Sequence, residues 1–188
     1  MVTGVSASGK DYLLSRAKEH EPRLGAQIPI VSMGSAILSK LSELGKSADR
    51  DRMKHIATNE VMRDVVRGIV ADLVLPYPAA VLNGHITYRQ QGEFVSNPDI
   101  DAEINPAAYA VVVADPNDIV EWRAADLSRR REPETADEIA YHQDFTIQAA
   151  ERMAVLLSSQ CQIIENSLDN TNASSLTLAT MVTDICPK

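Results

Sequence analysis

The stretch that decides the fold prediction is Gly4–Lys10, which reads GVSASGK. It fits the pattern GxxxxGK, in which glycines let the backbone wrap closely around phosphate oxygens while backbone N–H groups point at them. The short run Met1–Thr3 before it is strand-like. The apolar residues after it fall on one face of a helix: Tyr12, Leu13, Leu14 and Ala17. This context predicts a phosphate-binding loop, and a Gly/Ser loop that happens to precede a helix is the alternative.

Two features of this region depart from the usual pattern. The motif has Ser or Thr after the lysine to ligate Mg²⁺, whereas this chain has Asp11. A carboxylate can also reach a metal, but it places negative charge beside the phosphates. The strand before Gly4 is shorter than the usual ~5 residues. Either this strand is stunted, or translation starts further upstream.

Short apolar runs alternate with amphipathic stretches along the rest of the chain. Strands are expected over residues 27–31, 79–82, 107–114 and 161–165. Helices are expected from an N-cap at Ser35 to Gly45, from Asn59 to Pro76, after Asp115, over 136–158, and after Asn172 or Ser174. Residues 86–106 look polar and irregular. The alternation predicts an α/β, doubly wound parallel sheet of about five strands with helices on both faces, the P-loop NTPase fold, in a single domain 1–188.

Composition excludes several kinds of partner. The 188 residues carry 18 Lys and Arg against 26 Asp and Glu, a formal net charge of −8. A protein that neutralises nucleic-acid phosphates is normally basic, so no nucleic-acid partner is expected.

No apolar run approaches the ~20 residues of a membrane span, and no signal segment is expected at the start of the chain. The two cysteines lack metal-ligand spacing, which favours free thiols in a reducing cytoplasm.

A basic segment, Arg129-Arg130-Arg131, lies between two expected helices, with Arg123 six residues before it. As a small lid over residues 128–137 it would bring guanidinium groups over a transferring phosphoryl group and stabilise its charge. The alternative is a solvated basic loop balanced by Glu132 and Glu134.

Four blocks of the chain, in matching order and spacing, resemble archaeal-type adenylate kinases. One is the loop Gly4–Lys10, and another is Gly84-His85-Ile86-Thr87 after the middle strand. A third runs from Val31-Ser32-Met33-Gly34-Ser35 to Asp49-Arg50-Asp51-Arg52-Met53. The fourth, residues 128–143, contains an Arg-x-Arg-acid-x-acid-Thr segment followed by Ile139 and His142-Gln143. The resemblance covers nearly the whole chain.

This resemblance implies a nucleoside monophosphate kinase that moves the γ-phosphoryl group of ATP to AMP with Mg²⁺. It assigns ATP binding to Gly4, Ser6, Ser8, Gly9, Lys10, Asp11 and Arg123. It assigns the acceptor pocket, within an insertion over about 33–75 and the following strand, to Ser32, Gly34, Ser35, Arg50, His85 and Thr87. The catalytic charges would come from Lys10, Arg129 and Arg131. No general base is required, because the acceptor oxygen is already ionised.

The chain differs from the family at the metal. The family has an acidic residue at the end of the middle strand, where this chain has Asn83, and Asp11 replaces the hydroxyl ligand. Asp11 is therefore the one metal-ligand candidate. These differences keep two alternatives open: a nucleotide-binding protein without catalysis, and a P-loop kinase for another small acceptor. Family members are often oligomeric, so a homo-oligomer is compatible with the sequence.

Overall fold

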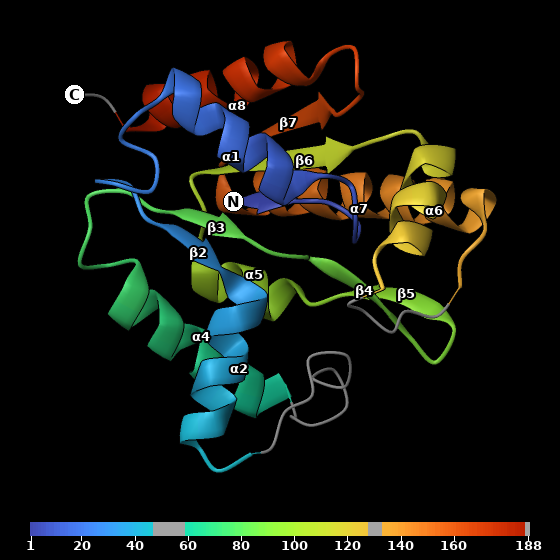
Figure 1. Cartoon of the computed structure of the whole chain (residues 1–188). Helices are drawn as coiled ribbons and strands as arrows, with labels where there is room; N and C mark the ends of the chain where they lie inside the picture. The colour runs from blue at the N-terminus through green and yellow to red at the C-terminus, as the bar shows by residue number, and fades with distance from the viewer. Residues whose placement is uncertain (47–58, 128–132, 187–188) are drawn as a thin grey trace.

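Strand β1 (Val2–Thr3), which leads into the Gly4–Lys10 loop, is the middle strand of the sheet in the computed structural model (Figure 1). The structure describes residues 1–46, 59–127 and 133–186. The five strands are parallel, in the order β2-β3-β1-β6-β7. The others are β2 (Ile30–Ser32), β3 (Val81–Asn83), β6 (Ala108–Val113) and β7 (Gln160–Glu165). The predicted parallel sheet is confirmed.

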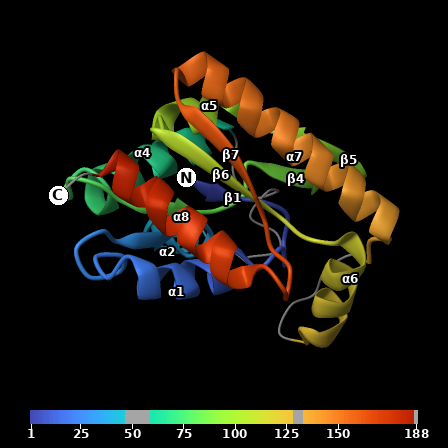
Figure 2. The same cartoon turned by 90° about the horizontal axis from the view of Figure 1, so that it is seen from above.

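Helices cover both faces of this sheet (Figure 2). Helices α1 (Lys10–His20) and α8 (Thr171–Ile185) pack together on one face, over Ala108, Ala110 and Val112 of β6. Helix α7 (Ala136–Leu157) packs on the other face, over Tyr109 and Val111. This division follows from the two-residue period of a strand, and both sides of β6 are apolar because both are buried.

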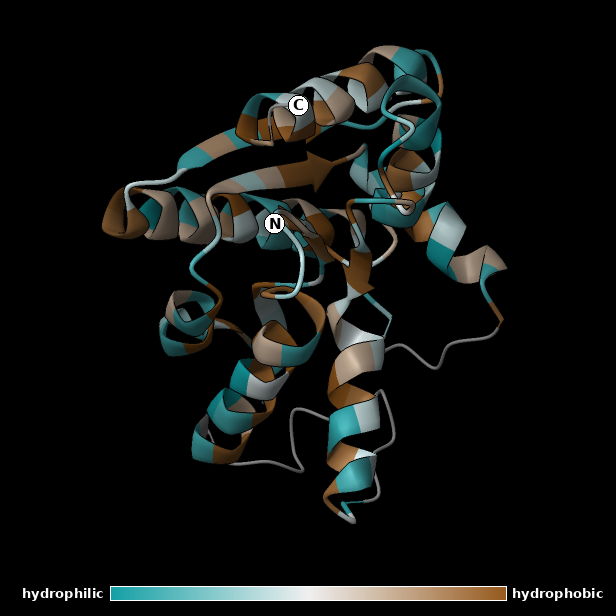
Figure 3. Ribbon diagram, turned by 90° about the vertical axis from the view of Figure 1, so that its left-hand side faces the viewer, coloured by the Kyte–Doolittle hydropathy of each residue, from teal (hydrophilic) through white to brown (hydrophobic). Residues whose placement is uncertain are grey.

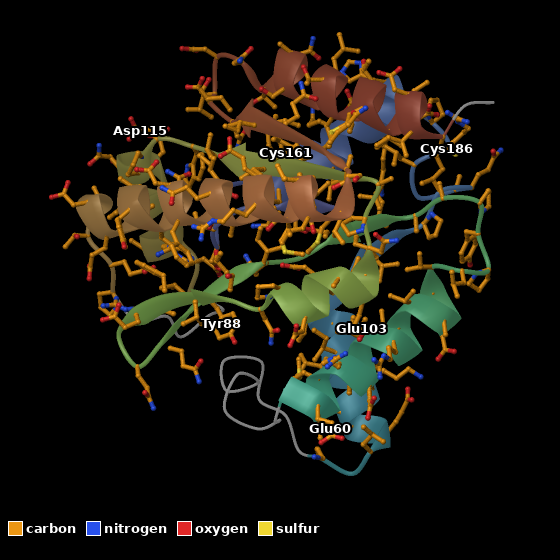
Figure 4. The ribbon with its side chains drawn as sticks, turned by 180° about the vertical axis from the view of Figure 1, so that it is seen from behind. Glu60, Tyr88, Glu103, Asp115, Cys161 and Cys186 are labelled. Carbon is orange, nitrogen blue, oxygen red and sulfur yellow. The ribbon has the colours of Figure 1, made fainter. Side chains whose placement is uncertain are left out.

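Three helices form a separate layer beside β2. Helices α2 (Met33–Glu43) and α4 (Asn59–Leu73) project below the sheet in Figure 3 and share a cluster containing Leu41, Val66 and Ile69. Helix α5 (Pro98–Ile104) is the third helix of this layer (Figure 4). Its Glu103 accepts hydrogen bonds from Arg63, at 2.8 Å, and from Arg67, at 2.6 Å. These ion pairs hold the pKa of the Glu103 carboxyl down at about 2.

Residues 86–106 correct the sequence prediction, because they are not irregular. They contain an antiparallel hairpin of β4 (Thr87–Gln90) and β5 (Glu93–Ser96), followed by α5. The two turn residues, Gln91 and Gly92, both have positive φ, 53° and 88°. That geometry suits the twist of a two-residue hairpin. The prediction failed because glutamine is an unusual residue at the first of these positions.

Several element boundaries also differ from those expected. Helix α2 begins at Met33 with Ser32 as its N-cap, so the predicted cap at Ser35 is wrong. Tyr12 is 55% exposed, so it does not share the buried face of Leu13 and Ala17. The predicted end of α2 is confirmed, since Gly45 has φ +69° and the N–H of Lys46 donates to Leu41 O. Helix α6 (Pro116–Ala125) follows β6 as expected.

Two smaller findings concern the cysteines and the helix lengths. Cys161 and Cys186 are free thiols, and burial raises the pKa of the Cys161 thiol. Among the residues that the structure describes, none of the helices has the length and apolar character that crossing a bilayer requires.

The start of α7 yields a test of the fold. Thr135 Oγ1 accepts a hydrogen bond from the N–H of Glu138, and Glu138 Oε2 accepts one from the N–H of Thr135, at 2.9 Å. This capping box satisfies two backbone donors. We expect Thr135→Ala to lower the free energy of unfolding by about 1 kcal/mol in urea titrations. Thr177→Ala is the control, because Thr177 bonds back to Ala173 O inside α8 and caps nothing.

Candidate functional site

The Lys10 ammonium group lies at the centre of the loop that follows β1. Lys10 Nζ donates to the carbonyl oxygens of Gly4 and Val5, at 2.9 and 2.8 Å, and lies 3.5 Å from Ser8 Oγ. The side chain is largely buried, so the loop surrounds the charge closely. Such an ammonium group, at the N-terminus of the 11-residue helix α1, provides an anion-binding centre. The structure therefore brings the predicted phosphate-binding residues together.

The loop can take this shape only because two of its positions lack a side chain. A Cβ on Gly4 would lie 2.2 Å from the carbonyl oxygen of Val112 in β6, and one on Gly9 would lie 2.0 Å from Asn166 Nδ2. Gly9 has φ +84°, and Ala7 also lies in the left-handed region at φ +65°. Left-handed residues in a loop can turn successive N–H groups toward one point, which is the geometry of a backbone nest for an anion.

Two amide side chains that the sequence analysis did not assign hold the loop and its neighbours in place. Asn166, directly after β7, donates from Nδ2 to Ser8 O at 3.0 Å, and its own N–H bonds to Val113 O. Gln143 on α7 accepts from the N–H of Ala114 and donates to its carbonyl, both at 2.9 Å. The signal for Asn166 was its place directly after a strand, at the edge where ligands bind in such sheets.

Arg123 joins the loop to the segment before α7. Its Nε and Nη2 donate to Ser6 O at 3.2 and 3.0 Å, and Nη1 pairs with Glu134. The guanidinium group is almost fully buried at this junction. The structure thus places Arg123 beside the predicted ATP-binding loop, where it fixes Ser6 through the backbone.

The two residues at which this chain departs from the usual metal ligands are in direct contact. Asn83 Nδ2, at the end of β3, donates to Asp11 Oδ1, in the first turn of α1, at 2.5 Å. The other carboxylate oxygen accepts no hydrogen bond from the residues that the structure describes. Carboxylate and amide oxygens are the hard ligands that Mg²⁺ prefers, so this pair fits the ion. Asp11, with Asn83 beside it, would hold Mg²⁺ at the mouth of the loop.

A second helix N-terminus opens at the same edge of the sheet. Ser32, Gly34 and Ser35 lie at the start of α2, and Ser32 Oγ is 3.3 Å from Ser35 Oγ. The exposed His85 lies on the loop after β3 and donates from Nδ1 to Gly4 O at 2.7 Å. Because β3 separates β1 from β2, these two strands are about 10 Å apart, twice the strand spacing. His85 follows the strand between them.

Thr87 was predicted to line the acceptor pocket, but the structure buries it in a polar network under the hairpin. Thr146 Oγ1 donates to His142 O, so Thr87 Oγ1 donates to Thr146, at 2.6 Å, and accepts from His142 Nε2, at 3.1 Å. This order puts the imidazole proton on Nε2, and Nδ1 is buried without a hydrogen-bond partner among the residues that the structure describes. The ring stacks on Phe94, at 4.1 Å between centroids. The network positions the hairpin against α7.

Three of the predicted site residues lie outside the described part of the chain. They are Arg50 in the acceptor segment and Arg129 and Arg131 in the lid segment. Their roles stay predictions. The lid was expected over residues 128–137, and the structure describes its last part, where Glu134 binds Arg123 and Thr135 caps α7.

Comparison with known families assigns the class. The family described as "AAA domain" (AAA_17) matches residues 3–140, which is more than half of the chain. The chain therefore belongs to this family of P-loop proteins. Its family and fold are of the P-loop kinase type.

The resemblance to archaeal adenylate kinases is also confirmed. The chain is 27% identical to an adenylate kinase of Pyrococcus horikoshii over 174 residues, which is 90% of this chain and 86% of that protein. It is 28% identical to one of Thermococcus kodakarensis over 173 residues, with the same coverage. It is 27% identical to one of Methanococcus vannielii over 172 residues, 88% of each.

Solved structures agree with this fold at low sequence identity. TT1252 from Thermus thermophilus superposes with a TM-score of 0.55 at 12% identity, covering 98% of this chain and 95% of its own. A sugar kinase from Janibacter gives 0.53 at 15%, covering 99% and 94%. A thymidylate kinase from Ehrlichia chaffeensis gives 0.51 at 12%, covering 96% of both chains. These similarities support the P-loop NTPase fold.

The contact between Gly9 and Asn166 gives a test of the loop. We expect Gly9→Ala to weaken ATP binding at least tenfold, because the new Cβ collides with the amide that holds Ser8 O. Calorimetric titration with ATP measures this. Gly92→Ala is the matched control, since Gly92 has a similar φ of +88° but no atom of the described part of the chain lies within 4 Å of the added Cβ. Equal ATP affinity in both variants would contradict the assignment.

The buried His142 gives a test of pH-dependent stability. Burial, aided by Arg123, Lys10 and Arg89, lowers the pKa of His142 from 6.5 to about 4. The unfolded chain therefore binds this proton first, and the contribution of His142 to stability falls as the pH drops below about 6.5. Between pH 7 and 5 the loss is on the order of 1 to 2 kcal/mol.

Comparison of variants isolates this effect. His142→Gln keeps a donor for Thr87 and removes the titration, so its change in unfolding free energy from pH 7 to pH 5 should be more favourable than that of the wild type by about 1 to 2 kcal/mol. Burial also raises the pKa of Asp101 to about 7, which acts in the opposite direction, but it does so equally in both proteins. His20→Gln, at the exposed end of α1, should retain the wild-type slope. If the unfolding free energy of His142→Gln changed with pH as it does in the wild type, the neutral, buried state of the imidazole would be contradicted.

Proposed function

We propose that the protein transfers the γ-phosphoryl group of ATP to a nucleoside monophosphate, with AMP as the favoured acceptor. The observation that carries the proposal is the pair of helix N-termini, those of α1 and α2, at one sheet edge with one strand between them. Each is suited to an anionic group. A donor and an acceptor phosphate can thus face each other across the end of β3.

On the donor side, the loop would hold the ATP phosphates. The backbone of Gly4–Gly9 would supply N–H donors, and Lys10 would exchange its bonds to Gly4 and Val5 for phosphate oxygens. His85 also donates to Gly4 O and would keep this carbonyl oriented when the lysine turns away. Arg123 would act through Ser6 by fixing the far end of the loop.

On the acceptor side, Ser32, Gly34 and Ser35 would bind the monophosphate at the start of α2. Arg50 would add positive charge there, and the segment 33–75 would form the acceptor-binding insertion. The ion pairs of Glu103 with Arg63 and Arg67 make α4 and α5 one unit behind this pocket. The name shared by the archaeal relatives, adenylate kinase, supports AMP as the acceptor.

The chemistry required is alignment and neutralisation of charge. The acceptor oxygen is already ionised, so no general base takes part. Mg²⁺, when bound, neutralises the β- and γ-phosphate oxygens. Lys10, and Arg129 and Arg131 from the lid over residues 128–137, would stabilise the charge that spreads over the moving phosphoryl group.

A coupled assay that follows ADP formation tests the proposal. Purified protein with ATP and Mg²⁺ is offered AMP, CMP, UMP, GMP and dTMP separately, and AMP should give the fastest turnover. Lys10→Met keeps the apolar stem and should lower kcat about 100-fold or more through loss of the positive charge. Lys18→Met, later on α1, is the matched control and should retain wild-type turnover.

The other outcomes separate the alternatives. Fast turnover with a different monophosphate would change the acceptor and keep the reaction. ATP binding without turnover on any monophosphate would overturn the proposal and favour a non-catalytic nucleotide-binding protein or a kinase for another small acceptor.

A further inference from the structure

The contact between Asp11 and Asn83 reverses the usual distribution of charge at a P-loop. The common pattern has a neutral hydroxyl directly after the lysine and an acidic residue on a neighbouring strand. In this chain the residue after the lysine is the acid, and the residue at the end of the neighbouring strand β3 is the neutral amide. The two side chains touch, at 2.5 Å, although 72 residues separate them in sequence. The pair therefore still carries one carboxylate.

We propose that the carboxylate that anchors the divalent cation has been exchanged across the crevice, so that Asp11 is the metal ligand and Asn83 is the residue that positions it. This inference rests on the proposed binding of ATP. At these two positions, Asp11 and Asn83 differ in residue type from the usual metal ligands of P-loop proteins.

The hydrogen bond explains how Asn83 positions the ligand. The amide Nδ2 binds Asp11 Oδ1 and so restricts rotation of the carboxylate. Asn83 is itself held, because it is 9% exposed and lies in register with Val2 of β1 and Ser32 of β2. The second oxygen of Asp11 stays available on an exposed side chain. A metal ligand with one oxygen fixed and one open is a pre-organised ligand.

A negative charge at position 11 has opposite effects with and without a metal. Without a divalent cation, the Asp11 carboxylate repels the phosphates that Lys10 attracts, because both charges lie at the mouth of one loop. With a divalent cation between them, the carboxylate and the phosphates attract the same ion. Asp11 should therefore make nucleotide affinity depend more strongly on metal than a neutral residue at this position would.

The exchange of the two side chains tests this directly. The probe is AMP-PNP, in which the imido bridge blocks γ-phosphoryl transfer, and calorimetry gives its dissociation constant with Mg²⁺ and with EDTA. The ratio of these constants is the metal coupling. Asp11→Asn should lower this coupling at least tenfold, about 1.4 kcal/mol. It should do so by weakening binding with Mg²⁺ and strengthening binding in EDTA.

The double variant Asp11→Asn/Asn83→Asp restores a carboxylate and an amide in exchanged positions. It should recover the coupling to within about threefold of wild type. Mn²⁺ binding in the presence of AMP-PNP, followed by electron paramagnetic resonance, should show the same loss in Asp11→Asn and the same recovery in the double variant. Asp99→Asn, which also removes an exposed acid from the first turn of a helix, is the matched control and should change neither quantity.

Unchanged coupling in Asp11→Asn would overturn the inference, as would tighter binding with Mg²⁺, which would mean that the pair blocks the ion. Lack of recovery in a folded double variant would overturn it as well. The failure of this inference and the failure of the proposed function can be told apart. If AMP-PNP binds with wild-type metal coupling but the assay with ATP shows no phosphoryl transfer, the kinase activity is rejected and the metal ligand is kept. Absence of AMP-PNP binding to the wild-type protein would overturn both.

Discussion

The close approach of the Gly4–Lys10 backbone to the ends of β6 and β7 is the constraint on which the site depends. Gly4 lies against the carbonyl of Val112, and Gly9 lies against the amide of Asn166, at distances that leave no room for a Cβ. The loop is thus fixed by strands that follow it by more than 100 residues. Lys10 and Asp11 follow directly on this packed segment, so the loop takes its observed shape only when β6 and the chain after β7 lie beside it.

The same strands explain why the fold was largely readable from the sequence. β6 is apolar on both faces, and the helices around it show one buried face each, so their periods predicted a parallel sheet covered on two sides. The hairpin over residues 87–96 was not readable, because its turn depends on positive φ at Gln91, a tertiary choice. The start of α2 was misplaced because three potential caps, Ser32, Gly34 and Ser35, stand close together.

The site was partly predictable for a related reason. A motif written in consecutive residues, such as GVSASGK, can be recognised in the sequence, and the structure brings its members together as expected. Contacts between distant residues cannot be recognised in this way. Asp11 and Asn83 were each noted as departures, but their hydrogen bond appears only when α1 is placed against β3. Thr87 was assigned to the crevice because it follows β3 closely, whereas the alternation of the hairpin turns it inward to His142.

A tryptophan side chain lies beside the loop. Trp122, the single tryptophan of the chain, packs from α6 against the cluster that contains Val5 of the loop. It is next in sequence to Arg123, which holds Ser6. The indole ring is only partly buried, so its emission responds both to the loop and to water. The protein therefore contains an intrinsic fluorophore where the loop and α6 pack together. Binding of the proposed nucleotide would then be followed by stopped-flow emission without any label.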